Sequence, residues 1–195
     1  MTEDKREPLV LAVTGGSGIL YALSFLEIAQ GAGVSVHLIV SAAGETVARH
    51  ELGPEGLKSL IELADEVHDP ENLAAPPASG SARWRAMVVV PCSMGTLGAI
   101  AHGISRNLIQ RAADCFLKER RPLVLVPRET PLNRIHLENM LRAHDAGAVI
   151  FPAMPGFYQL PSSIEDLARA FAGRIANHLG IPVPWLEQWK GLPEE

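Results

Sequence analysis

Cysteine, aromatic residues and excess positive charge are all scarce in this 195-residue chain. The two cysteines, Cys92 and Cys115, are too few for a disulfide framework and do not have the spacing of metal ligands. The formal net charge of −5 argues against general nucleic-acid binding. No apolar run approaches the ~18 residues of a membrane span, and the charged start, MTEDKREP, is unlike a signal peptide. We therefore expect a soluble protein of a reducing cytoplasm, with no membrane and no nucleic acid as partner.

Apolar residues, by contrast, make up 47% of the chain, and its mean hydropathy is +0.12. Only 5% of residues are aromatic, so the core must be largely aliphatic, as in a parallel sheet covered by helices. Strands are predicted at 9–14, 34–40, 86–91, 122–127 and 148–152. Helices are predicted at 18–32, 42–52, 56–64, 94–102, 105–119, 133–145 and 163–179, and a loop at 65–82. This alternation predicts an α/β fold, a three-layer α/β/α, doubly wound, mostly parallel sheet, in one domain over 1–195 with a tail from about 181.

The carboxyl ends of the strands share one edge of such a sheet, and ligands bind there. The segments that reach this edge are TGGSG (14–18), SAAGET (41–46), PCSMGT (91–96), RET (128–130) and PAMPGFY (152–158). Three of them are small, hydroxyl-rich turns before helices, whose N-termini present N–H groups and a favourable dipole to an anion. Arg128 adds a guanidinium fork suited to phosphate. The sequence therefore predicts a phosphate-bearing ligand at this edge.

Each feature also has a plainer explanation. TGGSG could be only a tight turn, Ser41 and Ser93 are ordinary N-cap residues, and Arg128 with Glu129 could form a surface ion pair. The convergence of these features at one edge favours ligand binding.

A dinucleotide fits poorly, because GxGxxG would need a glycine at Tyr21 and because Ser41, not an acid, follows the second strand. A mononucleotide with one phosphate fits better than NAD. His102 and His136 lie on helical patterns and are interpreted as structural. No pair of histidines has the spacing of metal ligands, so no metal is expected.

Longer motifs carry a family resemblance. TGGSG, the run from PCSMGT to VPRETPL, HLENML, GAVIFPAMPGFYQLP and NHLGIP together resemble the UbiX-type flavin prenyltransferases over about residues 9–182. The first loop of that family usually reads Gly-Ala-Ser-Gly, and Gly16 stands here at the alanine position. The resemblance implies a Rossmann-like flavoprotein that transfers a dimethylallyl group from dimethylallyl phosphate to N5 and C6 of reduced FMN without a metal. The prenylated FMN would serve a UbiD-type decarboxylase, in ubiquinone biosynthesis or in aromatic-acid breakdown.

The same resemblance implies roles for particular residues. The implied FMN-binding residues are Gly15, Gly16, Ser17, Ser41, Ser93, Met94, Gly95, Thr96 and Arg128. The implied catalytic residues are Ser17 near flavin N5, Glu129 for phosphate departure and proton transfer, Lys118 and Glu51. The implied ligands of the prenyl phosphate are Tyr158, Arg174 and Arg111. Family members form homo-oligomers, often dodecamers, with active sites at subunit contacts, so Glu51, Tyr158 and Arg174 are candidates to act on a neighbour's flavin.

Several alternatives remain open. An FMN-dependent cysteine decarboxylase of the same fold group usually carries an early catalytic histidine, whose context His37 and His50 lack. A non-catalytic flavin carrier would not need Glu129. Trp84 and Trp189 are candidates to stabilise an allylic cation or to act as hydrophobic anchors. The donor can be the monophosphate or the diphosphate.

Overall fold

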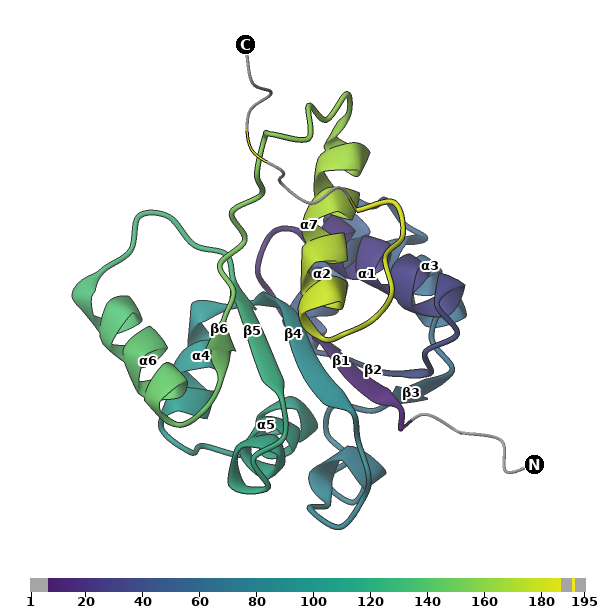
Figure 1. The fold of residues 1–195 in the computed structure, drawn as a ribbon. Helices are drawn as coiled ribbons and strands as arrows, with labels where there is room; N and C mark the ends of the chain where they lie inside the picture. The colour runs from purple at the N-terminus through teal and green to yellow at the C-terminus, as the bar shows by residue number, and fades with distance from the viewer. Residues whose placement is uncertain (1–6, 187–190, 192–195) are drawn as a thin grey trace.

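The computed structural model describes residues 7–186 and 191, and its centre is one six-stranded parallel sheet (Figure 1). The strand order is β3-β2-β1-β4-β5-β6, and each neighbouring pair is parallel. The strands are β1 (Leu9–Val13), β2 (Val36–Val40), β3 (Glu66–His68), β4 (Ala86–Cys92), β5 (Leu123–Pro127) and β6 (Val149–Ile150). This order is that of a doubly wound dinucleotide-type fold, so the predicted fold class is confirmed.

Helices cover both faces of the sheet (Figure 1). One face carries α1 (Ile19–Gly31), α2 (Ala42–Glu51), α3 (Gly56–Glu62) and α7 (Ile164–His178). The other carries α4 (Met94–Ala101), α5 (Leu108–Lys118) and α6 (Arg134–Asp145). Successive residues of a strand point to opposite faces, so β1 sends Leu9 and Leu11 into one core cluster and Val10 into the other. The central strands are therefore apolar at every position.

The predicted loop at 65–82 was partly wrong, because it contains β3 and a short 3-10 helix, η1 (Pro76–Ala78). β3 reads EVH, and a three-residue edge strand without an apolar run gives no periodic signal. At the other edge, β6 is shorter than the predicted strand at 148–152. Pairing nevertheless continues past it, through Phe151 N to Leu125 O and Ala153 N to Pro127 O, around Pro152, which has no N–H to donate.

β1 and β4 are neighbours at the centre, and the helices that follow them cover opposite faces. This is the switch point of a doubly wound sheet, where a crevice opens outside the strand ends. Thr14, buried at this point, ties the two strand ends together. Its hydroxyl donates to Pro91 O (2.8 Å) and accepts from Ser93 N (2.8 Å). The first and third of the hydroxyl-rich turns, TGGSG and PCSMGT, are therefore held in a fixed relation to each other.

Within residues 7–186 and 191, no helix has the length and apolar character needed to cross a membrane.

Candidate active site

A cavity of about 460 Å³ opens at the carboxyl edge of the sheet, beside the N-terminus of α1. Its polar lining comes from the first turn (Ser17 and Gly18), from Tyr21 of α1, from the end of α2 (Glu51), from Arg128 after β5 and from Glu165 of α7. Leu20, Leu52, Ala153 and residues of α7 complete it with mainly apolar surface. The predicted meeting of the first turn with Arg128 is thus present in the structure.

The carboxylate of Glu51 lies against the N-terminus of α1, where a helix favours a negative charge. Its carboxylate accepts from Ile19 N (2.8 Å) and from Gly18 N (3.0 and 3.1 Å to the two oxygens). Gly18, the N-cap residue, has no side chain with which to cap the helix. A carboxylate at a helix N-terminus is stabilised by the unpaired N–H groups and by the helix dipole. The Glu51 side chain is exposed. Because 33 residues separate it from Gly18 in the sequence, local sequence patterns could not reveal the contact.

Arg128 lies between two cavities. Besides the first, it lines an adjoining cavity of about 290 Å³ together with Glu129 and Thr130. Glu129 Oε1 accepts from Thr130 N at 3.0 Å. Among the described residues no ion pair joins Arg128 to Glu129, so the surface-pair explanation fails and both side chains face space that a ligand can fill.

Two glycines of the first turn are required by its geometry. Gly18 has a φ of +112°, which side chains rarely adopt. A Cβ on Gly15 would lie 2.7 Å from Ala43 Cβ at the start of α2, too close for the present packing. A Cβ on Gly16 would lie 3.2 Å from Pro91 Cβ, a tight contact that a small shift relieves. The alanine that the UbiX-type family usually has at this position would therefore fit at Gly16 after a small shift of its neighbours.

Ser41 and Ser93 both cap helices through their side chains, so the interpretation of these serines as ordinary N-cap residues is correct. Ser41 Oγ accepts from Gly44 N at 3.0 Å at the start of α2. Ser93 Oγ accepts from Thr96 N at 3.3 Å and donates to Thr96 Oγ1 at 3.0 Å at the start of α4. Met94, Gly95 and Thr96 form the first turn of α4, whose leading N–H groups face the same edge.

Tyr21 is a cavity residue that the sequence did not single out. Burial raises the pKa of its hydroxyl, against the lowering effect of Arg128, and Glu51 raises it further. Its ring packs on Phe171 of α7 at 4.8 Å between centroids. The phenol is therefore held neutral between the cation and the carboxylate of the cavity. The only clue in the sequence was its place one helical turn after TGGSG.

Arg111 and Lys118 do not reach this cavity. Arg111 pairs with Asp114 at 2.7 Å on α5, and Lys118 pairs with Glu119. Lys118 is the last residue of α5, and the chain then turns through Arg121, whose N–H donates to Phe116 O, into the start of β5. This end of α5, and Lys118 with it, therefore lies near the amino end of the sheet, opposite the cavity.

Tyr158 and Arg174 also lie outside the linings of both cavities. Tyr158, 45% exposed, belongs to the connection between β6 and α7. Arg174 is exposed on α7, with its guanidinium 5.9 Å from the centroid of the Phe151 ring. Trp84 is buried in the core against His37 and away from the cavity, which supports the anchor interpretation. Trp189 lies outside the described residues.

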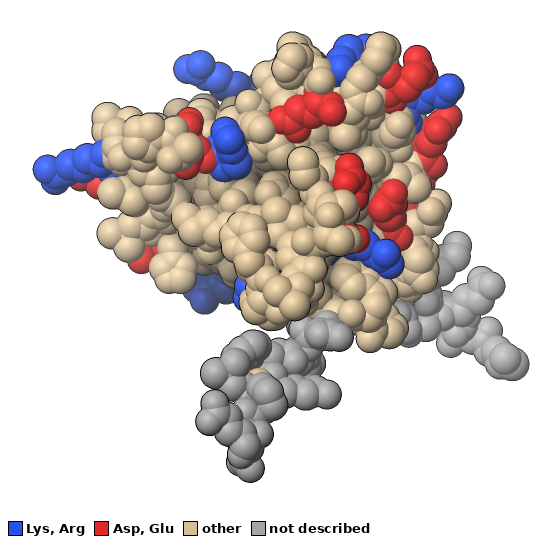
Figure 2. All heavy atoms as spheres, turned by 90° about the horizontal axis from the view of Figure 1, so that it is seen from above, with Lys and Arg blue, Asp and Glu red and all other residues tan. Residues whose placement is uncertain are grey.

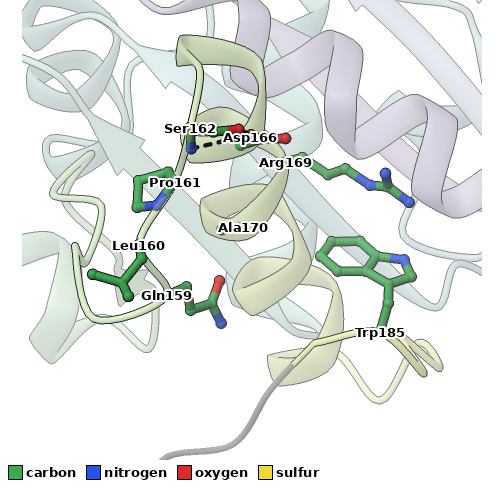
Figure 3. Close-up of a pocket in the computed structure, with 8 residues that line it drawn as sticks. All are labelled: Gln159, Leu160, Pro161, Ser162, Asp166, Arg169, Ala170 and Trp185. Carbon is green, nitrogen blue, oxygen red and sulfur yellow. Dashed lines mark hydrogen bonds between the residues drawn. The ribbon is translucent and has the colours of Figure 1, made fainter.

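A separate hollow of about 240 Å³ lies beside α7 (Figure 3). Arg169 lies 4.4 Å from the centre of the Trp185 ring, and Ser162 hydrogen-bonds Asp166 at its rim. None of the three hydroxyl-rich turns lines it. The stacked pair secures the tail residue Trp185 on α7, and we assign the hollow no part in the site.

Two histidines that are far apart in the sequence meet at the edge of the sheet. His37 Nδ1 and His68 Nε2 are 2.9 Å apart across β2 and β3, although 31 residues separate them in sequence. His102 and His136 have the structural places expected: His102 follows α4 and contacts Gly98 O, and His136 completes the capping box of α6. Burial raises the pKa of the Cys92 thiol to about 12, so this cysteine is inert.

The model of the flavoprotein family matches residues 1–172. The flavin prenyltransferase UbiX of Methanothermobacter thermautotrophicus is 49% identical over 183 residues, which cover 94% of this chain and 95% of the relative. The crystal structure of AnUbiX (PadA1) in complex with FMN and dimethylallyl pyrophosphate has a TM-score of 0.93 and 44% identity, and covers 96% of this chain and 100% of that one. A dodecameric FMN-dependent UbiX-like decarboxylase from Escherichia coli O157:H7 has a TM-score of 0.90 and 38% identity, and covers 94% and 100%.

Proposed function

We propose that this chain, which belongs to the flavoprotein family and within it to the UbiX flavin prenyltransferases, transfers a dimethylallyl group from dimethylallyl phosphate to N5 and C6 of reduced FMN. The observation that carries the proposal is the pair of adjoining cavities at the switch point, with Arg128 between them and Ser17, Glu51 and Glu129 on their walls. Relatives that match nearly the whole chain under that name support it.

The residues present fit FMN. The two cavities, about 460 and 290 Å³, fall in the size range of small-molecule sites. Ser17 presents an exposed hydroxyl from the glycine turn, and Arg128 presents a cation with no carboxylate partner among the described residues. Helix N-termini at α2 and α4 add N–H donors suited to a single phosphate. We assign FMN binding to Gly15, Gly16, Ser17, Ser41, Ser93, Met94, Gly95, Thr96 and Arg128.

The chemistry breaks the C–O bond of the donor, and the bonding electrons leave with the phosphate. Cations stabilise that departing charge. Glu129, beside Arg128 and exposed to the second cavity, is our choice to take up and return the protons that the two new bonds displace. Ser17 would hold the flavin edge at N5, and Glu51 would complete the wall opposite Arg128. No metal is part of the proposed reaction.

The donor phosphate needs more positive charge than Arg128 supplies, and the remaining assigned cations lie elsewhere in the chain. Lys118 lies near the amino end of the sheet, Arg111 is on the same helix α5, and Arg174 lies on α7 over Phe151. We propose that Lys118 and Arg111 act on the active site of a neighbouring subunit, where Tyr158 and Arg174 also bind the prenyl phosphate. Mixing Lys118→Ala with Glu129→Gln chains tests this, since mixed oligomers should regain part of the activity that each variant lacks. A mixture as inactive as its parents would refute it.

A homo-oligomer, as in the dodecameric relative, fits the exposed apolar surface. Figure 2 looks down on the carboxyl edge and shows a broad area without charged side chains. Large apolar side chains are exposed on α6, on the connection to α7 and at the start of α7: Ile135, Leu137, Leu141, Met154, Phe157, Leu160 and Ile164. Patches of this kind mark interaction sites. We propose that copies of the chain cover them in an assembly of twelve subunits, a number that sedimentation analysis can measure.

We further propose that residues 1–195 form one flavin-binding domain, because one sheet takes strands from residue 9 to residue 150. Both cysteines are free, as suits a reducing cytoplasm. The product would be handed to a UbiD-type decarboxylase.

The decisive experiment is anaerobic incubation with reduced FMN and dimethylallyl phosphate, followed by mass spectrometry of the released flavin. We expect a gain of one five-carbon unit. Unmodified flavin with both the monophosphate and the diphosphate donor would refute prenyl transfer and favour the cysteine decarboxylase or the flavin carrier. Decarboxylation of a cysteine-containing substrate, or its absence, then separates those two.

A further inference from the structure

Three metal-ligating side chains meet at the outer edge of the sheet, outside the flavin cavities. His37 of β2 is the register partner of Glu66 of β3, and Ile39 is the partner of His68. Side chains alternate along a strand, so Glu66 and His68 point to the same face, and the paired His37 points there with them. Parallel pairing thus brings together two imidazoles and one carboxylate.

The distances within this cluster suit a shared ion. His37 Nδ1 lies 2.9 Å from His68 Nε2 and 3.4 Å from Glu66 Oε2. Two nitrogens that each bind one tetrahedral ion at about 2.0–2.1 Å lie roughly 3.3 Å apart. Ligand atoms of the three residues all fall within 4.8 Å of one another, so small side-chain adjustments make room for an ion.

We propose that His37, Glu66 and His68 bind one divalent first-row transition-metal ion, with Zn²⁺ as the reference ion. Two imidazoles and a carboxylate are ligands that Zn²⁺ takes in proteins, and water completes the coordination.

Neighbouring residues bury the two histidines and restrict the His37 ring. The side chains of His37 and His68 are 15% and 6% exposed, whereas Glu66, at 52%, leaves a path from solvent. The edge of Trp84 packs on the His37 ring, 4.9 Å between centroids, and limits its rotation.

The position indicates a structural site, separate from the chemistry. His37 precedes the end of β2 at Val40 by three residues, roughly 10 Å at about 3.3 Å per residue, and the flavin cavities open beyond that end. β3 is a three-residue strand at the edge of the sheet. An ion held by both strands would fasten β3 to β2. The proposed prenyl transfer remains free of metal.

The test is calorimetric titration of Zn²⁺ into the full-length, tag-free chain after treatment with a chelator. We expect one ion per chain, and His37→Gln should weaken binding at least on the order of tenfold. His144→Gln, which removes an exposed histidine on α6, is the matched control and should leave binding unchanged. Glu66→Gln, on a half-exposed side chain that tolerates replacement, should also weaken binding, so the test does not depend on the buried His68.

Absence of stoichiometric binding would overturn the proposal, and so would equal affinity of the His37→Gln and His144→Gln chains. Hydrogen exchange gives an independent readout: Zn²⁺ should slow exchange of the β3 amides, and unchanged exchange in saturating Zn²⁺ would contradict the fastening of β3. Neither readout involves prenyl transfer, so failure here is distinct from failure of the proposed function.

Discussion

Replacement of Glu51 tests the electrostatics of the cavity directly. Its carboxylate accepts hydrogen bonds from Gly18 N and Ile19 N at 2.8–3.1 Å, at the positive end of α1. Glu51→Gln keeps an acceptor and removes the charge, whereas Glu51→Ala removes both. Since no side chain caps α1 from the N-cap position itself, nothing else in the described chain replaces the lost acceptor.

The magnitude follows from the geometry. A charge in the first turn of a helix stabilises by about 0.3–1 kcal/mol, and up to ~2 kcal/mol when partly buried. Glu51 is exposed but makes short contacts, so we expect the glutamine variant to lose about 0.5–1 kcal/mol. The alanine variant also loses the hydrogen bonds, for a total of about 1.5 kcal/mol. For a chain of this length that total lowers the Tm by roughly 3–6 °C.

Differential scanning calorimetry at one protein concentration measures the shift, because the Tm of an oligomer depends on concentration. Glu27→Gln, on the exposed side of the same helix, is the control and should stay within about 0.5 kcal/mol of the parent. Added salt should shrink the Glu51 effect. Removal of Glu51 should also tighten inorganic phosphate binding at the freed helix end. Variants as stable as the control, at low salt, would refute the assigned role of Glu51 as the anion of α1.

Three further predictions concern the proposed active site. Glu129→Gln should retain FMN affinity and slow prenyl transfer by about 10²-fold or more; unchanged turnover would remove Glu129 from the mechanism. Gly15→Ala should reduce flavin affinity and stability because its Cβ meets Ala43 at 2.7 Å, while Gly16→Ala, at 3.2 Å from Pro91, should bind flavin normally; equal losses in fluorescence titrations would contradict this packing argument. The chain has two tyrosines, so tyrosinate absorbance in the Tyr158→Phe variant reports Tyr21 alone. Its pKa should exceed 10, and its contribution to stability should persist below pH 10 and fall as pH rises above it.

The sheet could be predicted from the sequence because its central strands are buried on both faces. β1, β4 and β5 are runs of apolar residues with a turn signal at each end, and such runs are unambiguous when helical patterns separate them. β3 gave no such signal, since two of its three residues are exposed. Its pairing with β2 depends on how the chain between the two strands folds, which the sequence pattern of β3 does not show. The sheet order likewise depends on contacts between distant segments.

The sequence predicted the part of the candidate site that comes from the ends of the strands. Ser93 and Arg128 directly follow strands, and Ser17 lies in the turn after β1. Topology alone brings these strand ends to one edge. Glu51 and Tyr21 join them from helices, through packing of α1 against α2 and α7 that local patterns do not encode. The resemblance identified Glu51 as a residue of the site, but only the structure places its carboxylate at the start of α1. The meeting of His37 with His68 depended on a strand that the sequence did not reveal.

The arrangement of charge bears on the proposed self-association. Cations stabilise a departing phosphate. The described lining of the two cavities contains one cation, Arg128, and three carboxylates, Glu51, Glu129 and Glu165. Arg111 and Lys118 lie on α5, and Lys118 is at the opposite end of the sheet. No side-chain rotation spans a sheet of five-residue strands, roughly 17 Å at about 3.3 Å per residue, so Lys118 cannot serve the cavity of its own chain, and Arg111 lines neither cavity. If prenyl transfer uses them, the active subunit is one of a pair, and dilution to the monomer should abolish turnover before it releases the flavin.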